Sequence, residues 1–170
     1  DVLLALSKYD SALEELREAA KLRYSRFPLE YSSDLPCAIL LPHLANIKGV
    51  VMVLDLRALA ELEADQPEKA LADLNLAFRW NDSIRNEPFL ISHLVRIAVQ
   101  SILMQPVWQG LAQQKWSDTQ IAELDSELGK QDYLADFHRA MRGERAASIG
   151  TIDYLRRNRQ YPDLFGFDMD

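Results

Sequence analysis

Apolar side chains recur every three or four residues along most of this sequence, which is the spacing of one face of an α-helix. Over residues 2–23 the apolar stripe is opposed by charged side chains, which predicts an amphipathic helix. The segment 89–105 is apolar on nearly every side, as is typical of a central helix. Further helices are expected over residues 43–64, 67–80, 117–129 and 132–157. The pattern thus predicts about six helices and no strand.

Prolines and glycines mark where these helices begin and end. Pro28 ends the first helix and opens an irregular connection, and Pro67 suits the first turn of a new helix. Pro106 is expected to kink or break the central helix, with 107–112 continuing as a short helical piece. Gly49 lies inside a helical pattern, where it indicates the close approach of another helix.

Composition supports the same fold class. The chain has 170 residues, of which 48% are hydrophobic. Leu and Ala number 46, whereas the β-branched Val, Ile and Thr number 18, which favours helix over strand. We therefore predict an all-α fold, a compact bundle or short superhelix of antiparallel hairpins. One domain is expected over residues 1–160, followed by a tail over 161–170.

Charge and ligand types exclude several classes of function. The net charge of −7 argues against nucleic-acid binding, which needs clustered cations. A single cysteine, Cys37, excludes an intrachain disulfide and a multi-cysteine zinc site. The histidines His43, His93 and His138 lie on three different predicted helices without metal-ligand spacing, so we expect no metal and no cofactor. No uninterrupted apolar run approaches 20 residues, so no membrane span is expected in this chain.

Small residues recur in the segment 51–83 at a spacing known from helical repeats. They are Ala58, Ala70 and Ala77. The segment resembles one tetratricopeptide repeat, in which two antiparallel helices pack through small residues, so the resemblance implies helix–helix contact at these alanines. Glu61 stands where that family usually has an aromatic residue, and Asp82 where it has a closing proline. No second copy follows, so the resemblance implies one repeat-like hairpin rather than a solenoid.

Five short segments spread over the chain are similar to an uncharacterised bacterial all-helical family. They are RFP at 26–28, LPHL at 41–44, SHLVRIA at 92–98, PVW at 106–108 and RGER at 142–145. Members of that family commonly carry a hydrophobic N-terminal segment ahead of such a domain. The resemblance therefore implies a protein that is exported or membrane-anchored through a segment absent from this chain, or is otherwise cytoplasmic. It implies no activity.

A polar cluster is the main candidate for chemistry. The last predicted helix has one stripe at helical spacing, formed by Leu134, Phe137, Met141, Glu144, Ser148, Ile152 and Leu155. Glu144 lies in the middle of this apolar face, where an unpaired carboxylate is costly, so we expect it to have a partner. The central helix offers a polar strip, formed by Ser92, His93, Arg96 and Gln100. Arg57 is a third possible member, unless Glu61 four residues later holds it.

Two hypotheses account for the polar cluster. In the first, Glu144, Arg96 and their neighbours form a buried ion-pair network that docks the last helix on the central one. In the second, they line a pocket in which Glu144 acts as acid or base and His93 or Arg96 contacts a substrate. The sequence contains no GxSxG, phosphate-binding glycine loop or HExxH motif. We therefore expect a non-enzymatic protein-interaction or scaffold domain, with an enzyme or small-ligand-binding domain as the alternative.

The tail provides a further candidate for interaction. Its apolar residues alternate with aspartates and glycine, and they are Leu164, Phe165, Phe167 and Met169. Such a segment is too short to build its own core. It docks on its own domain, binds another subunit, which gives self-association, or has no fixed contact. The predicted interaction function implies a protein or peptide partner, and the tail offers a route to self-association.

Overall fold

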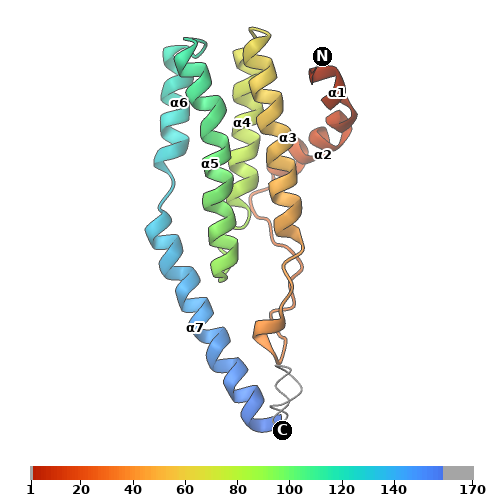
Figure 1. Ribbon diagram of the computed structural model, residues 1–170, viewed down its shortest axis with the longest axis vertical. Helices are drawn as coiled ribbons and strands as arrows, with labels where there is room; N and C mark the ends of the chain where they lie inside the picture. The colour runs from red at the N-terminus through yellow and green to blue at the C-terminus, as the bar shows by residue number, and fades with distance from the viewer. Residues whose placement is uncertain (1, 159–170) are drawn as a thin grey trace, which may run out of the picture.

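Three long helices form the centre of the structure, a computed structural model that describes residues 2–158 (Figure 1). They are α3 (His43–Glu63), α4 (Pro67–Asp82) and α5 (Leu90–Ala112). Helix α4 packs against α3 and α5 and runs antiparallel to both, so α3 and α5 run parallel to each other. The core between them is apolar, and it includes Ile47, Val51, Leu54, Leu74, Phe78, Val99 and Leu103. The described part of the chain is all-helical, as its composition predicted.

The α3–α4 hairpin brings the three spaced alanines into the core. Ala58, Ala70 and Ala77 are fully buried, so the two helices approach each other through side chains of minimal size. The turn between the helices passes through Asp65, whose φ of 59° lies in the left-handed region. Aspartate tolerates this conformation better than most residues do, and Pro67 then begins α4.

The remaining helices surround this centre. Helices α1 (Val2–Leu6) and α2 (Asp10–Ala20) pack against α3 and α4, and α6 (Asp118–Gly129) packs against α4. The hydroxyl of Ser117 accepts the N–H of Gln120 while the Gln120 side chain accepts the N–H of Ser117, so α6 begins at the capping box. Helix α7 (Tyr133–Asn158) packs on the first half of α5 and extends well past its start (Figure 1).

Two expectations about helix boundaries are corrected by the structure. The expected helix over 2–23 is divided, since a 3-10 turn at Ser7–Tyr9 separates α1 from α2. Helix α5 continues through Pro106, which is buried inside it, so this proline does not end the helix. Its ring removes one backbone hydrogen bond, and core packing on both sides offsets that loss. The prediction for residues 161–170 lies outside the described residues.

Close approach occurs at glycines other than Gly49. A Cβ atom built on Gly49 meets no heavy atom within 4 Å, because this position is exposed. A Cβ atom on Gly143 of α7 would instead lie 1.9 Å from the carbonyl oxygen of Pro88, in the connection before α5. The absence of a side chain at Gly143 therefore allows α7 to pack against the backbone at Pro88.

Substituting these two glycines should change stability in opposite directions. Gly143→Ala must displace the backbone at Pro88, so we expect a loss of about 1–3 kcal/mol in the free energy of unfolding. Gly49→Ala is the matched control, and it should gain about 0.5–1 kcal/mol because alanine favours the helix. Urea unfolding followed by circular dichroism measures both. Equal effects of the two substitutions would show that α7 does not dock through Gly143.

Candidate functional site

A buried arginine joins three segments of the fold. Arg96 of α5 is 1% exposed, and its Nη1 donates to Oδ2 of Asp136 at 2.5 Å. Its Nη2 donates to Oδ1 of Asp82 at 3.0 Å and to Oε1 of Gln131 at 2.7 Å. These partners lie at the start of α7, the end of α4 and the connection between α6 and α7. One guanidinium thus fixes the relative positions of α4, α5 and α7 and of the connection that precedes α7.

The acidic partner of this arginine is stabilised as a carboxylate. Asp136 is buried and also receives hydrogen bonds from Arg85 at 3.3 Å and Arg139 at 2.9 Å. Burial alone would raise the pKa of Asp136, but hydrogen bonds and charges from Arg96 and Arg85 hold it below its ordinary value. Burial and the charge of Arg96 lower the pKa of His93, although the charge of Asp136 opposes this effect.

The structure places the five residues predicted for this cluster at separate points. Glu144 accepts the backbone N–H of Leu90 at 2.8 Å, so it caps the start of α5 instead of meeting Arg96. His93 lies beside the rings of Tyr133 and Phe137. Gln100 contacts the sulfur of Met104, and Arg57 belongs to a second ion cluster on α3 and α4. The structure brings only His93 and Arg96 of the predicted set close together.

The difference arises from the orientation of α7. The apolar stripe that was expected to face inward is largely exposed, since Leu134 is 68% exposed and Phe137 and Met141 are exposed as well. The residues that face α5 are offset by part of a turn, and they are Asp136, Ala140, Gly143 and Glu144. Asp136 was missed because it lies outside the apolar stripe. Its position two turns before Glu144, on the same side of the helix, was the available signal.

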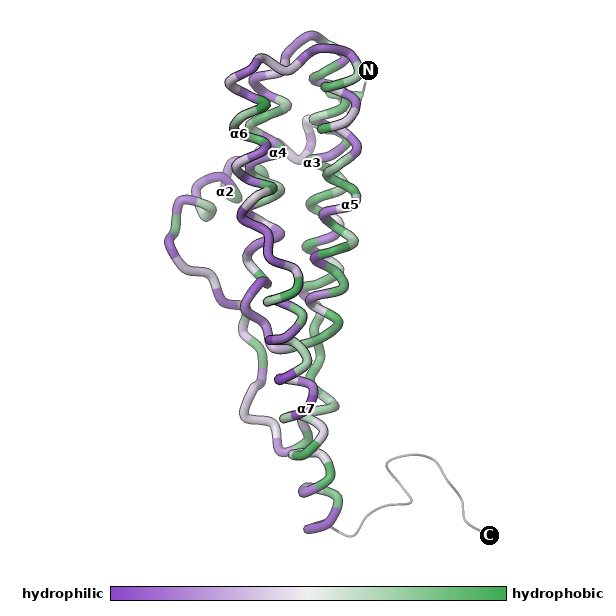
Figure 2. Tube along the Cα trace, turned by 90° about the vertical axis from the view of Figure 1, so that its left-hand side faces the viewer, coloured by the Kyte–Doolittle hydropathy of each residue, from purple (hydrophilic) through white to green (hydrophobic). Residues whose placement is uncertain are grey.

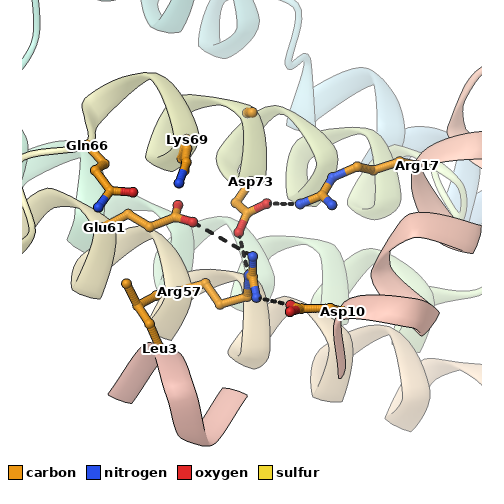
Figure 3. A pocket seen from close by; sticks show the side chains of 9 residues that line it. Leu3, Asp10, Arg17, Arg57, Glu61, Gln66, Lys69 and Asp73 are labelled. Carbon is orange, nitrogen blue, oxygen red and sulfur yellow. Dashed lines mark hydrogen bonds and ion pairs between the residues drawn. The ribbon is translucent and has the colours of Figure 1, made fainter. Parts of the chain in front are cut away.

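The second ion cluster lines a pocket of about 470 Å³ between α2, α3 and α4 (Figure 3). The carboxylate of Asp73 on α4 accepts hydrogen bonds from Arg17 of α2 at 2.6 Å and from Arg57 of α3 at 2.8 Å. Arg57 also donates to Asp10 at 2.6 Å. Lys69 points to the same space from the first turns of α4 (Figure 3). The arginines are held by carboxylates, so this cluster ties the N-terminal helices to the α3–α4 hairpin.

One carboxyl group of this pocket has an altered acidity. Glu61 is 3% exposed, and its nearest cation is Nη2 of Arg57 at 3.8 Å. Burial and the charge of Asp73 raise the pKa of Glu61 to about 7, although Arg57 opposes this effect. Burial likewise raises the pKa of Asp55 to about 6 on the same helix. Both groups are more easily protonated in the folded chain than in the unfolded chain.

A third polar group links the start of α3 to the start of α5. Glu87 accepts the hydroxyl of Ser92 at 2.6 Å and lies 2.8 Å from Nε2 of His43. The carboxylate therefore stands between the hydroxyl and the imidazole, so His43 is not placed to take a proton from Ser92. Cys37 is exposed in the short 3-10 segment Pro36–Ala38. Within residues 2–158 no group of three or more His, Cys, Asp or Glu side chains could hold a metal ion.

The outer side of α5 is uncharged and largely apolar, with Ser101 and Gln105 as its exposed polar residues. Between Leu90 and Ala112 the ionisable residues are His93 and Arg96, and both are buried. Large apolar side chains on the other side of this helix are exposed, and they are Ile91, Leu94, Ile97, Trp108 and Leu111. Figure 2 shows α5 coloured as hydrophobic over most of its length. This surface was not anticipated, because all-round apolarity of a helix predicts burial on every side.

Two helical segments are long and apolar enough to cross a membrane by length and composition alone. They are Pro36–Glu63 and Leu90–Ala112, and 28% and 39% of their most apolar windows are buried. Both contain interrupting polar residues, so counting uninterrupted apolar runs did not detect them. The core helix of a globular protein passes the same test. Both helices therefore carry apolar surface beyond the part that the described fold covers.

Comparison of this chain with protein-family models, with curated proteins and with solved structures finds no match. Functional inference therefore starts from the geometry of the described residues. That geometry consists of closed ion clusters and an exposed apolar face.

Removing the charge of Asp136 should strongly destabilise the fold. In Asp136→Asn the buried Arg96 loses its main counter-charge, so we expect a loss of about 3 kcal/mol in the free energy of unfolding. Glu144→Gln is the matched control, because an amide oxygen can still accept the N–H of Leu90, and its cost should stay below about 1 kcal/mol. Chemical denaturation at pH 7 measures both. A larger loss of stability in Glu144→Gln than in Asp136→Asn would show that the docking of α7 on α5 depends on Glu144 instead.

Neutralising Glu61 should remove a pH-dependent instability. Its folded pKa of about 7 exceeds its ordinary value of 4.5, so the folded state holds a proton that the unfolded state has lost. Stability therefore falls as the pH rises through this range. Glu61→Gln should match the natural chain near pH 5 and exceed its stability by about 2 kcal/mol at pH 8. Glu15→Gln, an exposed change of equal charge, serves as control in the same melting series, and equal gains from both would refute the assignment.

Proposed function

We propose that this chain is a non-enzymatic interaction domain that binds a protein partner on the outer face of α3 and α5. The observation that carries the proposal is the absence of any exposed charge on α5 over its full described length. A surface helix of a globular domain ordinarily shows charged residues to water. An uncharged apolar helix face is therefore a candidate interaction surface.

The proposed surface extends from α5 onto α3. Glu63 near the end of α3 accepts hydrogen bonds from Gln109 and Gln113, which sets the register of the two parallel helices. Counting back 11 residues along both helices places Met52 at the level of residues 98–102 of α5. Met52 and its neighbour Leu56 are both exposed. The α3–α5 face is hereafter defined as Met52, Leu56, Leu94, Ile97, Ala98 and Trp108.

The α3–α5 face has the size and chemistry of a helix-binding surface. Helix α5 has 23 residues and is about 35 Å long. Leu94 is 50% exposed and Trp108 is 65% exposed, and covering each large side chain would contribute about 1 kcal/mol or more. The small Ala98 and Ser101 between them are exposed as well and leave room for the side chains of a partner. An amphipathic helix laid along the face would use spaced apolar anchors.

The interior of the domain supports this assignment as a scaffold. The α3–α4 pair, joined through Ala58, Ala70 and Ala77, is consistent with a tetratricopeptide-like hairpin that presents neighbouring helices to a partner. The alternative, a small-ligand or catalytic pocket at Glu144, Arg96 and His93, receives less support. Arg96 is almost fully buried and already has three partners, so a ligand would have to displace them.

Site-specific photo-crosslinking tests the proposed surface. Benzoylphenylalanine replaces Leu94 in one variant and the exposed Glu15 of α2 in the matched control, and each is irradiated in extracts of the cells that make the protein. We expect a discrete partner protein to be linked from position 94 and not from position 15. The yield of this crosslinked product should fall about tenfold when Ile97→Glu is added. The partner would then bury an unpaired charge, which costs at least about 1.4 kcal/mol.

Two outcomes would overturn the proposal. The first is the same set of products from positions 94 and 15, which indicates nonspecific adhesion. The second is an Ile97→Glu variant that melts like the natural chain and retains every crosslink.

A further inference from the structure

Helix α7 is basic within an acidic chain. The net charge of the chain is −7, yet α7 carries five arginines and three carboxylates. Its carboxylates are largely engaged within the domain. Asp136 is buried against Arg96, Glu144 caps α5, and Asp153 lies 3.8 Å from Arg156. Arg139 and Arg156 are paired in turn with Asp136 and Asp153, so the positive charge that α7 shows to its surroundings comes from Arg142, Arg145 and Arg157.

Apolar and basic side chains share one side of this helix. The α7 stripe is defined as Phe137, Met141, Arg145, Ser148, Ile149, Ile152 and Arg156, which recur at helical spacing. All seven are exposed. Arg142 is exposed at the edge of the stripe. A segment that covers the stripe should therefore combine apolar side chains with carboxylates.

The chain itself contains a segment of that chemistry. Residues 161–170 read YPDLFGFDMD, in which three aspartates alternate with aromatic and aliphatic residues. The geometry of α7 and this complementarity lead us to propose that residues 161–170 bind along the α7 stripe of the same chain. The contact uses a surface different from the α3–α5 face, so it stands independently of the proposed function.

The length of the segment permits this contact within one chain. Helix α7 ends at Asn158, and Met141 lies 17 residues earlier, about 26 Å back along the helix axis. The twelve residues from 159 to 170 span at most about 40 Å when extended. The segment is therefore long enough to reach the whole α7 stripe from the end of the helix.

Two alternative occupants of the stripe fit less well. A short tether holds residues 161–170 near the stripe at an effective concentration in the millimolar range, which favours the same chain over a second copy. An anionic membrane would attract the arginines of α7 but repel the rest of a chain whose net charge is −7. The aspartates of the segment match the arginines without that repulsion.

Disulfide trapping in the full chain tests the proposal. Cys37 is the sole cysteine, so Cys37→Ser supplies a background for the pair Ser148→Cys and Gly166→Cys, which keeps every charge and aromatic residue in place. We expect mild oxidation to link the pair within one chain, so that the product migrates as a compact monomer on a non-reducing gel. The matched control is Glu15→Cys with Gly166→Cys, which should link at least about fivefold less.

Charge and salt supply a second readout. Arg145→Glu in the trapping background should lower the yield about fivefold, and salt at about 1 M should act in the same direction because the ion pairs lie at the surface. The exposed Arg23→Glu, a matched charge reversal on the connection after α2, should leave the yield unchanged. Equal effects of the two reversals would show that the stripe does not attract the segment.

Three other outcomes would overturn the proposal. Equal linkage of the two cysteine pairs would indicate random collision. Disulfide-linked dimers as the main product would assign the stripe to the segment of a second copy. Failure to link, together with flotation on vesicles containing phosphatidylserine that Arg145→Glu abolishes, would assign the stripe to a membrane surface. None of these outcomes changes the expected crosslink at Leu94, so the two proposals fail separately.

Discussion

The buried pair of Arg96 and Asp136 is the interaction on which the arrangement of the helices depends. A guanidinium that is 1% exposed needs a carboxylate at close range, since an isolated buried charge is prohibitively costly. Asp136 lies 2.5 Å from Arg96, and Asp82 and Gln131 accept from the other terminal nitrogen of the same guanidinium. Because these partners come from different segments, satisfying one side chain also determines how α4, α5 and α7 meet.

The orientation of α7 is a consequence of this pair. Consecutive residues on a helix differ by about 100°, so turning Asp136 toward α5 leaves Met141 exposed and Phe137 at the edge of the contact, where it lies beside His93. The apolar stripe of α7 is consequently exposed beside its arginines. The same arrangement leaves the far side of α5 uncovered, because α3, α4 and α7 occupy its other sides. The exposure of the α7 stripe is therefore a consequence of how one buried charge is satisfied.

The two ion clusters have a structural role, because their charged groups already bind one another. In both clusters the guanidinium groups are already paired with carboxylates, which is typical of devices that fix helix positions. The exposed apolar groups have no comparable partner within the described fold. Helix positions thus depend on the polar groups, while the capacity to bind another molecule lies with apolar side chains that the fold does not cover.

The sequence by itself determined the helical class and most helix positions, because periodicity, capping residues and turn residues act over a few neighbours. Ser117 with Gln120, and Pro67, mark helix starts that the structure retains. It also placed Arg96 and His93 on a buried part of the central helix. Which carboxylate meets Arg96, and which side of α7 faces inward, depended on contacts between residues 40 positions apart. Only the tertiary structure decided these points, since a local pattern reports the apolar stripe of a helix but not whether a buried charge turns that stripe outward.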